Sequence, residues 1–141
     1  RDRLRSRGLG DVYKRQAKRY LPPLPVSFTY KEEEQGAFAL MHMMGKSKGN
    51  AEYLAQAQAI KDATMGWFIA RNMKSKFLHF NGNYHSDFQG GIIPYLLQYR
   101  PGTTIKTVCS VRQESIGQLD EENKGRADFY ICVPEDMTST Y

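Results

Sequence analysis

The longest regular pattern in the chain is helical, and it limits the fold more than any other feature. Between about Asn50 and Asn72, side chains that would share one helical face recur three or four residues apart. They are Tyr53, Ala57, Ile60, Thr64, Trp67 and Phe68. Asn50 suits the N-cap position, and Glu52 places a negative charge in the first turn, where the helix dipole favours it. The sequence therefore predicts one long helix that packs one face against a core.

After this stretch the pattern changes to short apolar runs, which are typical of buried strands. These runs span residues 77–80, 104–111 and 128–133. A second helix is predicted over residues 91–99, where Pro94 is tolerated only in the first turn. Residues 112–127 are polar and are predicted to form a loop or a poor helix. Strands that alternate with helices predict an α/β fold, with a partial parallel sheet flanked by helices.

The basic charge of the chain is concentrated at its start. The net charge is +5, but residues 1–16 hold six Lys or Arg and two Asp, which is +4, and the remainder holds fourteen Lys or Arg and thirteen Asp or Glu, which is +1. The first segment resembles translated sequencing-adaptor read-through, so we expect it to be non-native; a genuine basic arm is the alternative. Without this segment, nucleic acid is not expected as a partner.

Several common sites have no signature in the sequence. It contains no P-loop, Gly-x-Gly-x-x-Gly, Gly-x-Ser-x-Gly or His-Glu-x-x-His motif. Cys109 and Cys132 fit no zinc-binding spacing, and each lies in a predicted strand, so we expect both to be small core residues. No apolar run approaches the roughly 18 residues that a membrane helix needs.

The stretch FLHFNGNYHSDFQGG, residues 77–91, holds the candidate site. Ligands of open parallel sheets bind beyond the carboxyl ends of strands, and the turn that begins at Asn81 directly follows a predicted strand. Gly82 allows a tight turn or a close approach to a ligand. His85 can ligate a metal or haem iron or transfer a proton, and Tyr84 carries a phenol that can ligate ferric haem iron. A histidine that only makes hydrogen bonds within a loop is the alternative interpretation of His85.

Three further residues bear on this site. Asp62 shares a face of the predicted helix with Gln58, and it either faces solvent or points toward the sheet edge, where it would join His85 in one site. Asp87 could orient a histidine or accept a hydrogen bond. His79 lies within an apolar run and is expected to be a core residue.

Four segments resemble one protein family in their residues and in their order. They are AKRYLPPLPV, NAEYLAQAQAIKDATMGWFIARN, FLHFNGNYHSDFQGGIIPYL and ADFYICVPEDMT, and together they extend over roughly residues 17–141. They resemble the C-terminal half of the ChaN-like haem-binding lipoproteins, a DUF399-type family that is grouped with Tiki, pheromone-shutdown and erythromycin-esterase-like proteins. The strings FNGNYHSD and CVPEDMT are most similar to Bacteroidetes members.

The resemblance implies that residues 17–141 are the C-terminal part of a ChaN-like haem-binding domain, with a parallel sheet and a smaller helical portion. It implies haem as the cofactor, held in a cleft at the sheet edge. It also implies a lipid-anchored or periplasmic protein of the cell envelope with a non-enzymatic role in iron acquisition. The implied partners are a second copy of the chain, in a homodimer, and an outer-membrane iron or haem receptor system.

The resemblance also implies a set of site residues. Gly82 to His85 match the family's Gly-x-x-His element, so His85, with Tyr84, Gly82 and Asn81, is expected to contribute to the cofactor site. Asp62 matches the acidic position of the helix motif. The wider group pairs this element with an N-terminal Gly-Glu-x-His-like element, which is absent from this sequence. A metal-dependent hydrolase of the Tiki-like group, in which His85 ligates a divalent metal and Asp62 assists, is the alternative function.

Overall fold

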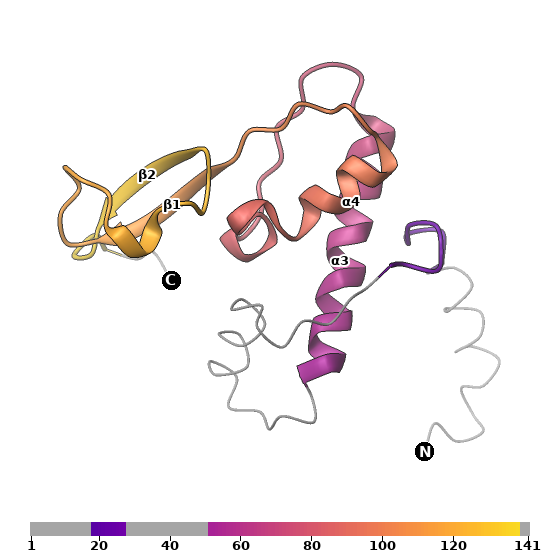
Figure 1. Cartoon of the computed structure of the whole chain (residues 1–141), viewed down its shortest axis with the longest axis horizontal. Helices are drawn as coiled ribbons and strands as arrows, with labels where there is room; N and C mark the ends of the chain where they lie inside the picture. The colour runs from indigo at the N-terminus through magenta and orange to yellow at the C-terminus, as the bar shows by residue number, and fades with distance from the viewer. Residues whose placement is uncertain (1–17, 28–50, 139–141) are drawn as a thin grey trace.

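The computed structural model of the chain describes residues 18–27 and 51–138 (Figure 1). Segment 1–16 and the expected N-cap Asn50 lie outside the described residues. The described elements are, in chain order, α3 (Ala51–Asn72), the 3-10 helices η2 (Asn83–His85) and η3 (Asp87–Gln89), α4 (Ile92–Tyr99), β1 (Val108–Gln113), the 3-10 helix η4 (Glu121–Asn123) and β2 (Phe129–Pro134). In these ranges no helix is long and apolar enough to cross a membrane.

Helix α3 confirms the predicted long helix, but the face that it buries is not the predicted one. Its buried residues from position 55 onward are mostly small: Ala55, Ala59, Asp62, Ala63, Gly66 and Ile69. Trp67, on the predicted inward face, is only half-buried. Small residues allow α4 to approach closely, since a Cβ at Gly66 would lie 3.0 Å from the Leu96 nitrogen. Close backbone approach, rather than the largest apolar side chains, therefore selects the buried face.

Helix α4 confirms the second predicted helix, with Pro94 in its first turn. Its buried residues Ile92 and Leu96 form a core cluster with Ile69 of α3. Burying a side chain of this size stabilises a fold by roughly 1.5–3 kcal/mol. Arg100, directly after α4, donates from Nη1 to main-chain carbonyl oxygens at the C-terminal end of α3, at 2.5 Å to Met73 and 3.3 Å to Ala70. These contacts satisfy carbonyl groups that the helix leaves without partners.

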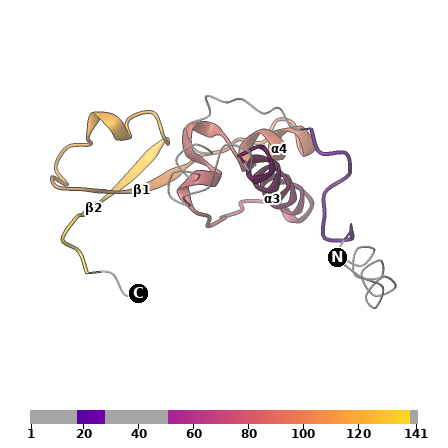
Figure 2. The same ribbon diagram turned by 90° about the horizontal axis from the view of Figure 1, so that it is seen from below.

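Strands β1 and β2 pair in parallel, with Val108 opposite Phe129 and Gln113 opposite Pro134. The pairing confirms the α/β fold class and the polar connection predicted between the two strands. Cys109 is buried and Cys132 half-buried, and both are free thiols. The sheet lies beside the α3–α4 pair, and the 3-10 helices of residues 83–89 lie between the two in both views (Figures 1 and 2).

The strand predicted over residues 77–80 does not form. This segment has no strand partner in the described part of the chain, and Phe77, Leu78 and Phe80 are 46%, 77% and 86% exposed. His79 is exposed as well, so its predicted place in the core is wrong. An apolar run becomes a strand only where another strand satisfies its backbone hydrogen bonds, and that condition cannot be read from the run itself.

Candidate functional site

Residues 81–91, here named the His85 loop, fold into two short 3-10 turns. The His85 nitrogen donates to the Gly82 carbonyl oxygen at 2.9 Å, and the Gly90 nitrogen donates to that of Asp87 at 3.0 Å. The Asn81 side-chain nitrogen donates to the Gly82 carbonyl oxygen at 2.9 Å and to the Ser86 hydroxyl at 3.1 Å. Asn81 and Gly82 therefore shape the turn that presents His85.

Gly91 closes this loop against its own backbone. Its φ is +55°, and a Cβ built at Gly91 would lie 2.2 Å from the carbonyl oxygen of His85. Phe88 and Gln89 also adopt left-handed backbone angles, which residues with a side chain rarely take. They are held there by a hydrogen bond from the Phe88 nitrogen to the Arg126 carbonyl oxygen at 2.8 Å, and by one from Gln89 Nε2 to the Thr107 hydroxyl at 3.1 Å.

The loop brings the His85 imidazole against the Asp62 carboxyl of α3, with Nδ1 and Oδ1 2.5 Å apart. The Asp62 side chain is only 7% exposed, whereas that of His85 is 22% exposed. The possibility that Asp62 faces solvent is therefore wrong. A helix residue and a loop residue that are 23 positions apart in sequence form one buried pair with one side open to solvent.

Burial raises the pKa of Asp62 from its ordinary value, because an ionised carboxylate is poorly solvated there, and the hydrogen bond with His85 acts in the opposite direction. When Asp62 is ionised it accepts the Nδ1 proton of His85. This leaves the lone pair on Nε2, which has no hydrogen bond to any described residue. The pair thus holds the imidazole in the tautomer whose Nε2 lone pair can accept a proton or bind a metal ion.

The Tyr84 ring borders this imidazole, and the charge of the imidazole reaches His79. The Tyr84 ring meets the His85 ring edge-on, with centroids 5.4 Å apart and planes at 83°. His79, which was expected in the core, is near enough for an electrostatic effect. Its pKa is lowered first by partial burial and then by the charge of His85. This electrostatic effect between the two histidines was not anticipated, although the sequence places both of them in one stretch.

Asp87 does not contact His85 but anchors the loop to the sheet. Its Oδ2 accepts from Arg126 Nη2 at 2.7 Å and from Nε at 3.0 Å, which is a two-pronged ion pair. Its Oδ1 is 3.6 Å from the thiol of Cys109 in β1, and Arg126 Nη1 donates to the Asn123 side chain at 2.7 Å. Arg126 is 39 positions from Asp87, and no local pattern marks it.

The sequence predicted that the His85 loop would lie at the carboxyl ends of the strands, and this prediction is wrong. Gln89 bonds Thr107 and Asp128, the residues just before β1 and β2, and Asp87 contacts Cys109, the second residue of β1. The prediction depended on a strand over residues 77–80, and without that strand the loop packs along the first half of β1.

The donor atoms of the site suit haem better than a divalent metal ion. Among the described residues no group of three His, Cys, Asp or Glu could hold a metal ion, and the site itself offers two donors, His85 and Asp62. Haem iron needs only one axial nitrogen from the protein on a given face, and an oriented imidazole beside an aromatic ring provides it. The residues present therefore fit haem.

One comparison with known proteins finds a relation. Residues 2–96 match the sequence model of a family described as haem-binding uptake, Tiki superfamily, ChaN. The matched range includes α3, the whole His85 loop and the first half of α4. No curated protein and no solved structure matches the chain.

Proposed function

We propose, because the chain belongs to the haem-binding uptake family of ChaN in the Tiki superfamily, that it binds haem through the imidazole of His85. The observation that supports this ligand most directly is the 2.5 Å contact between His85 Nδ1 and Asp62 Oδ1, which leaves the lone pair on Nε2 of a side chain that is 22% exposed. Bound haem would supply an iron that accepts one nitrogen lone pair and a flat apolar surface that must be shielded from water.

Each residue of the site has a distinct role in this proposal. Asp62 holds the tautomer and the orientation of the ring and makes Nε2 a stronger donor, as carboxylates do for histidine ligands in metal sites. Tyr84 packs against the imidazole and offers the second candidate ligand, its phenol oxygen. Asn81 and Gly82 keep the turn in the shape that brings His85 to Asp62.

The proposed physiological role is haem or iron acquisition at the cell envelope, by a lipid-anchored or periplasmic protein that binds haem without transforming it. The word uptake in the family description supports it. A homodimer and an outer-membrane iron or haem receptor system are the proposed partners. These parts of the proposal depend on the family alone and are independent of the His85 assignment.

Titration of the purified chain with haemin tests the ligand. We expect a saturable shift of the Soret band, which His85→Ala abolishes. Asp62→Asn should weaken the affinity roughly 10- to 100-fold without removing the histidine spectrum, because it disturbs the orientation and basicity of the ligand. Tyr84→Phe distinguishes the two candidate ligands, since it changes the spectrum only if the phenol binds iron. An unchanged Soret shift in His85→Ala would show that His85 is not a ligand.

A metal-dependent hydrolase remains the second candidate. A carboxylate–histidine pair is also what orients histidines that bind zinc, so the Asp62–His85 contact supports this function too. It has less support because the described residues provide only two donors. Metal analysis of protein purified without added metal distinguishes the functions. A stoichiometric metal ion that is lost in His85→Ala, together with no affinity for haemin, would favour the hydrolase.

A further inference from the structure

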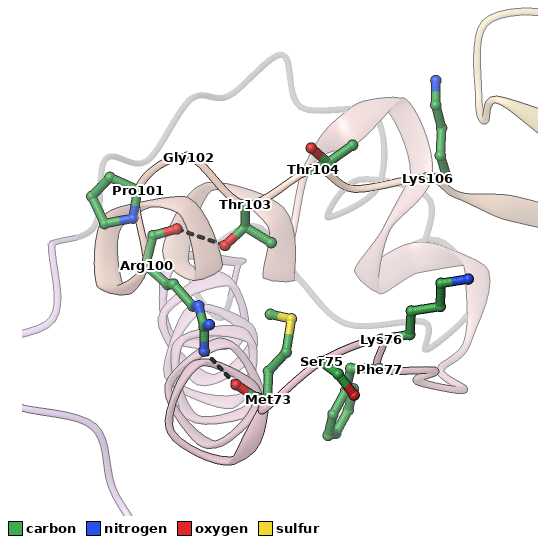
Figure 3. Close-up of a pocket in the computed structure, with 10 residues that line it drawn as sticks. All are labelled: Met73, Ser75, Lys76, Phe77, Arg100, Pro101, Gly102, Thr103, Thr104 and Lys106. Carbon is green, nitrogen blue, oxygen red and sulfur yellow. Dashed lines mark hydrogen bonds between the residues drawn. The ribbon is translucent and has the colours of Figure 1, made fainter.

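A hollow lies between the two segments that leave α3 and α4. It measures about 810 Å³ and is lined on one side by Met73 and residues 75–77 and on the other by residues 100–104 and Lys106 (Figure 3). Its lining includes three cationic residues, Lys76, Arg100 and Lys106, and no Asp or Glu. A hollow of this size can take a small molecule, and the charge selects an anionic one.

The three cations are not equivalent. Arg100 is turned toward the end of α3, where it bonds carbonyl oxygens, so part of its charge offsets the negative end of the helix dipole (Figure 3). Lys76 and Lys106 lie on the opposite side of the hollow (Figure 3). Lys106 is paired with Asp128 at 2.7 Å, whereas Lys76 has no ion-pair partner among the described residues. The charge available to a ligand is therefore centred on Lys76, with Lys106 as a weaker second site.

The rest of the lining is suited to an apolar body. The Met73 side chain projects into the space between the two segments, and Phe77 also lines the hollow, although its ring is turned to the far side of its own segment (Figure 3). Phe77 is 46% exposed, which is a large uncovered area for an aromatic side chain. An apolar floor beside lysine side chains fits a molecule that has an apolar body and carboxylate groups at one end.

The lysine side of the hollow is linked to the His85 loop through residues next to Lys76 and Lys106 in the sequence. Lys106 precedes Thr107, whose hydroxyl accepts the hydrogen bond from Gln89 in the His85 loop. Lys76 stands on the segment that leads directly into that loop. We propose that Lys76 and Lys106 bind the carboxylate groups of a porphyrin. The choice of ligand rests on the proposed haem-binding function; the position rests on the hollow and its charge.

Iron-free protoporphyrin tests this carboxylate site separately from the histidine, because it cannot be ligated. Binding to the purified chain is followed by porphyrin fluorescence, with the dimethyl ester of the same porphyrin as the uncharged comparison. We expect the diacid to bind more tightly than the ester and to weaken as salt is added. Lys76→Gln should weaken the diacid roughly three- to tenfold, the range of one charge-assisted contact, and Lys106→Gln should weaken it less.

Lys74→Gln is the matched control. Lys74 lies two positions before Lys76 and carries the same charge, but it does not line the hollow. This variant should leave the affinity unchanged, and all three variants should keep the unfolding midpoint within the small range of surface substitutions. Equal affinity for diacid and ester, or an equal loss in Lys74→Gln, would overturn the proposed site.

The outcomes also distinguish this site from the proposed haem ligand. His85→Ala should leave the binding of iron-free porphyrin unchanged, and Lys76→Gln should leave the Soret maximum of the saturated haemin complex unchanged. If haemin shows a His85-dependent Soret shift while the iron-free diacid does not bind, the lysine site is wrong and the ligand stands. If the diacid binds with the expected lysine dependence but His85→Ala leaves the haemin spectrum unchanged, the ligand assignment is wrong and the lysine site stands.

Discussion

The α3–α4 pair and the junction between the His85 loop and the sheet are held together by different interactions. The helices meet at Gly66 and through a small apolar cluster. The junction is polar and depends on Asp87–Arg126, on Gln89 with Thr107 and Asp128, and on a bond of 2.8 Å from Asn83 to the Ser110 carbonyl oxygen. The Asp62–His85 pair joins the two regions, with its carboxyl on the helix and its imidazole on the loop. Its geometry therefore depends on both kinds of interaction.

Adding a methyl group to one glycine in each region should give the largest difference between the regions in the free energy of unfolding. Gly91→Ala combines a positive φ with a Cβ 2.2 Å from a backbone oxygen that cannot move aside, and we expect it to destabilise the fold by roughly 2–4 kcal/mol. Gly66→Ala should cost less, about 0–2 kcal/mol, because the gain in helix propensity offsets part of the contact with α4 at 3.0 Å. Urea unfolding of both variants measures the difference.

Gly82→Ala is the control for both glycine variants. Gly82 has a negative φ, and a Cβ there would meet no atom within 4 Å. We expect this substitution to change the free energy of unfolding by less than about 0.5 kcal/mol. If Gly66→Ala were more damaging than Gly91→Ala, the helix pair would be the more constrained of the two regions.

An arginine in each region provides the next comparison. Arg126→Gln leaves the Asp87 carboxylate, 17% exposed, without its cation, and we expect a loss of roughly 1–3 kcal/mol together with weaker haemin binding. Arg100→Gln removes only hydrogen bonds to exposed carbonyl oxygens and should cost about 1 kcal/mol or less. Asp87→Asn combined with Arg126→Gln should recover part of the loss. A greater loss for Arg100→Gln would contradict the proposed importance of the polar junction.

The two regions also differ in how far the sequence predicts them. Both helices were found because helical spacing is local, and β1 and β2 were found because each is an apolar run between polar segments. The same kind of run at residues 77–80 forms no strand, since its fate depends on a partner. The Asp62–His85 pair could be suggested from a helix face and a Gly-x-x-His turn. The Asp87–Arg126 pair could not, because no local signal links positions so far apart.

The contribution of Asp62 to stability should decrease as the pH rises. Its folded pKa is raised above the unfolded value, first by burial, so its contribution to stability is fully present below the unfolded pKa of about 3.9 and is lost as the pH rises through the folded pKa. Asp62→Asn cannot titrate. The free energy of unfolding of the wild type relative to this variant should therefore decline as the pH is raised from 3 toward neutrality, as urea unfolding at each pH measures. A relative stability that rises over this range would contradict the burial argument.

Asp128, in the polar junction, should show the opposite sign and the smallest effect. Its pKa lies well below the ordinary range, because its carboxyl accepts hydrogen bonds from Lys106 at 2.7 Å and from the Thr107 nitrogen and hydroxyl at 2.9 and 3.0 Å. The stability that it contributes is present above the unfolded pKa of about 3.9 and is lost as the pH falls toward the folded value. The wild type should therefore lose stability relative to Asp128→Asn on acidification below pH 4.

Because Asp128 is an exposed residue, added salt should reduce the part of this difference that comes from Lys106, and Lys106→Gln should remove that part. The part from Thr107 should survive both changes, since a hydrogen bond from the backbone does not depend on a mobile charge. Complete loss of the difference in salt would mean that Asp128 acts only through an exposed ion pair and that the junction is not fixed at this point.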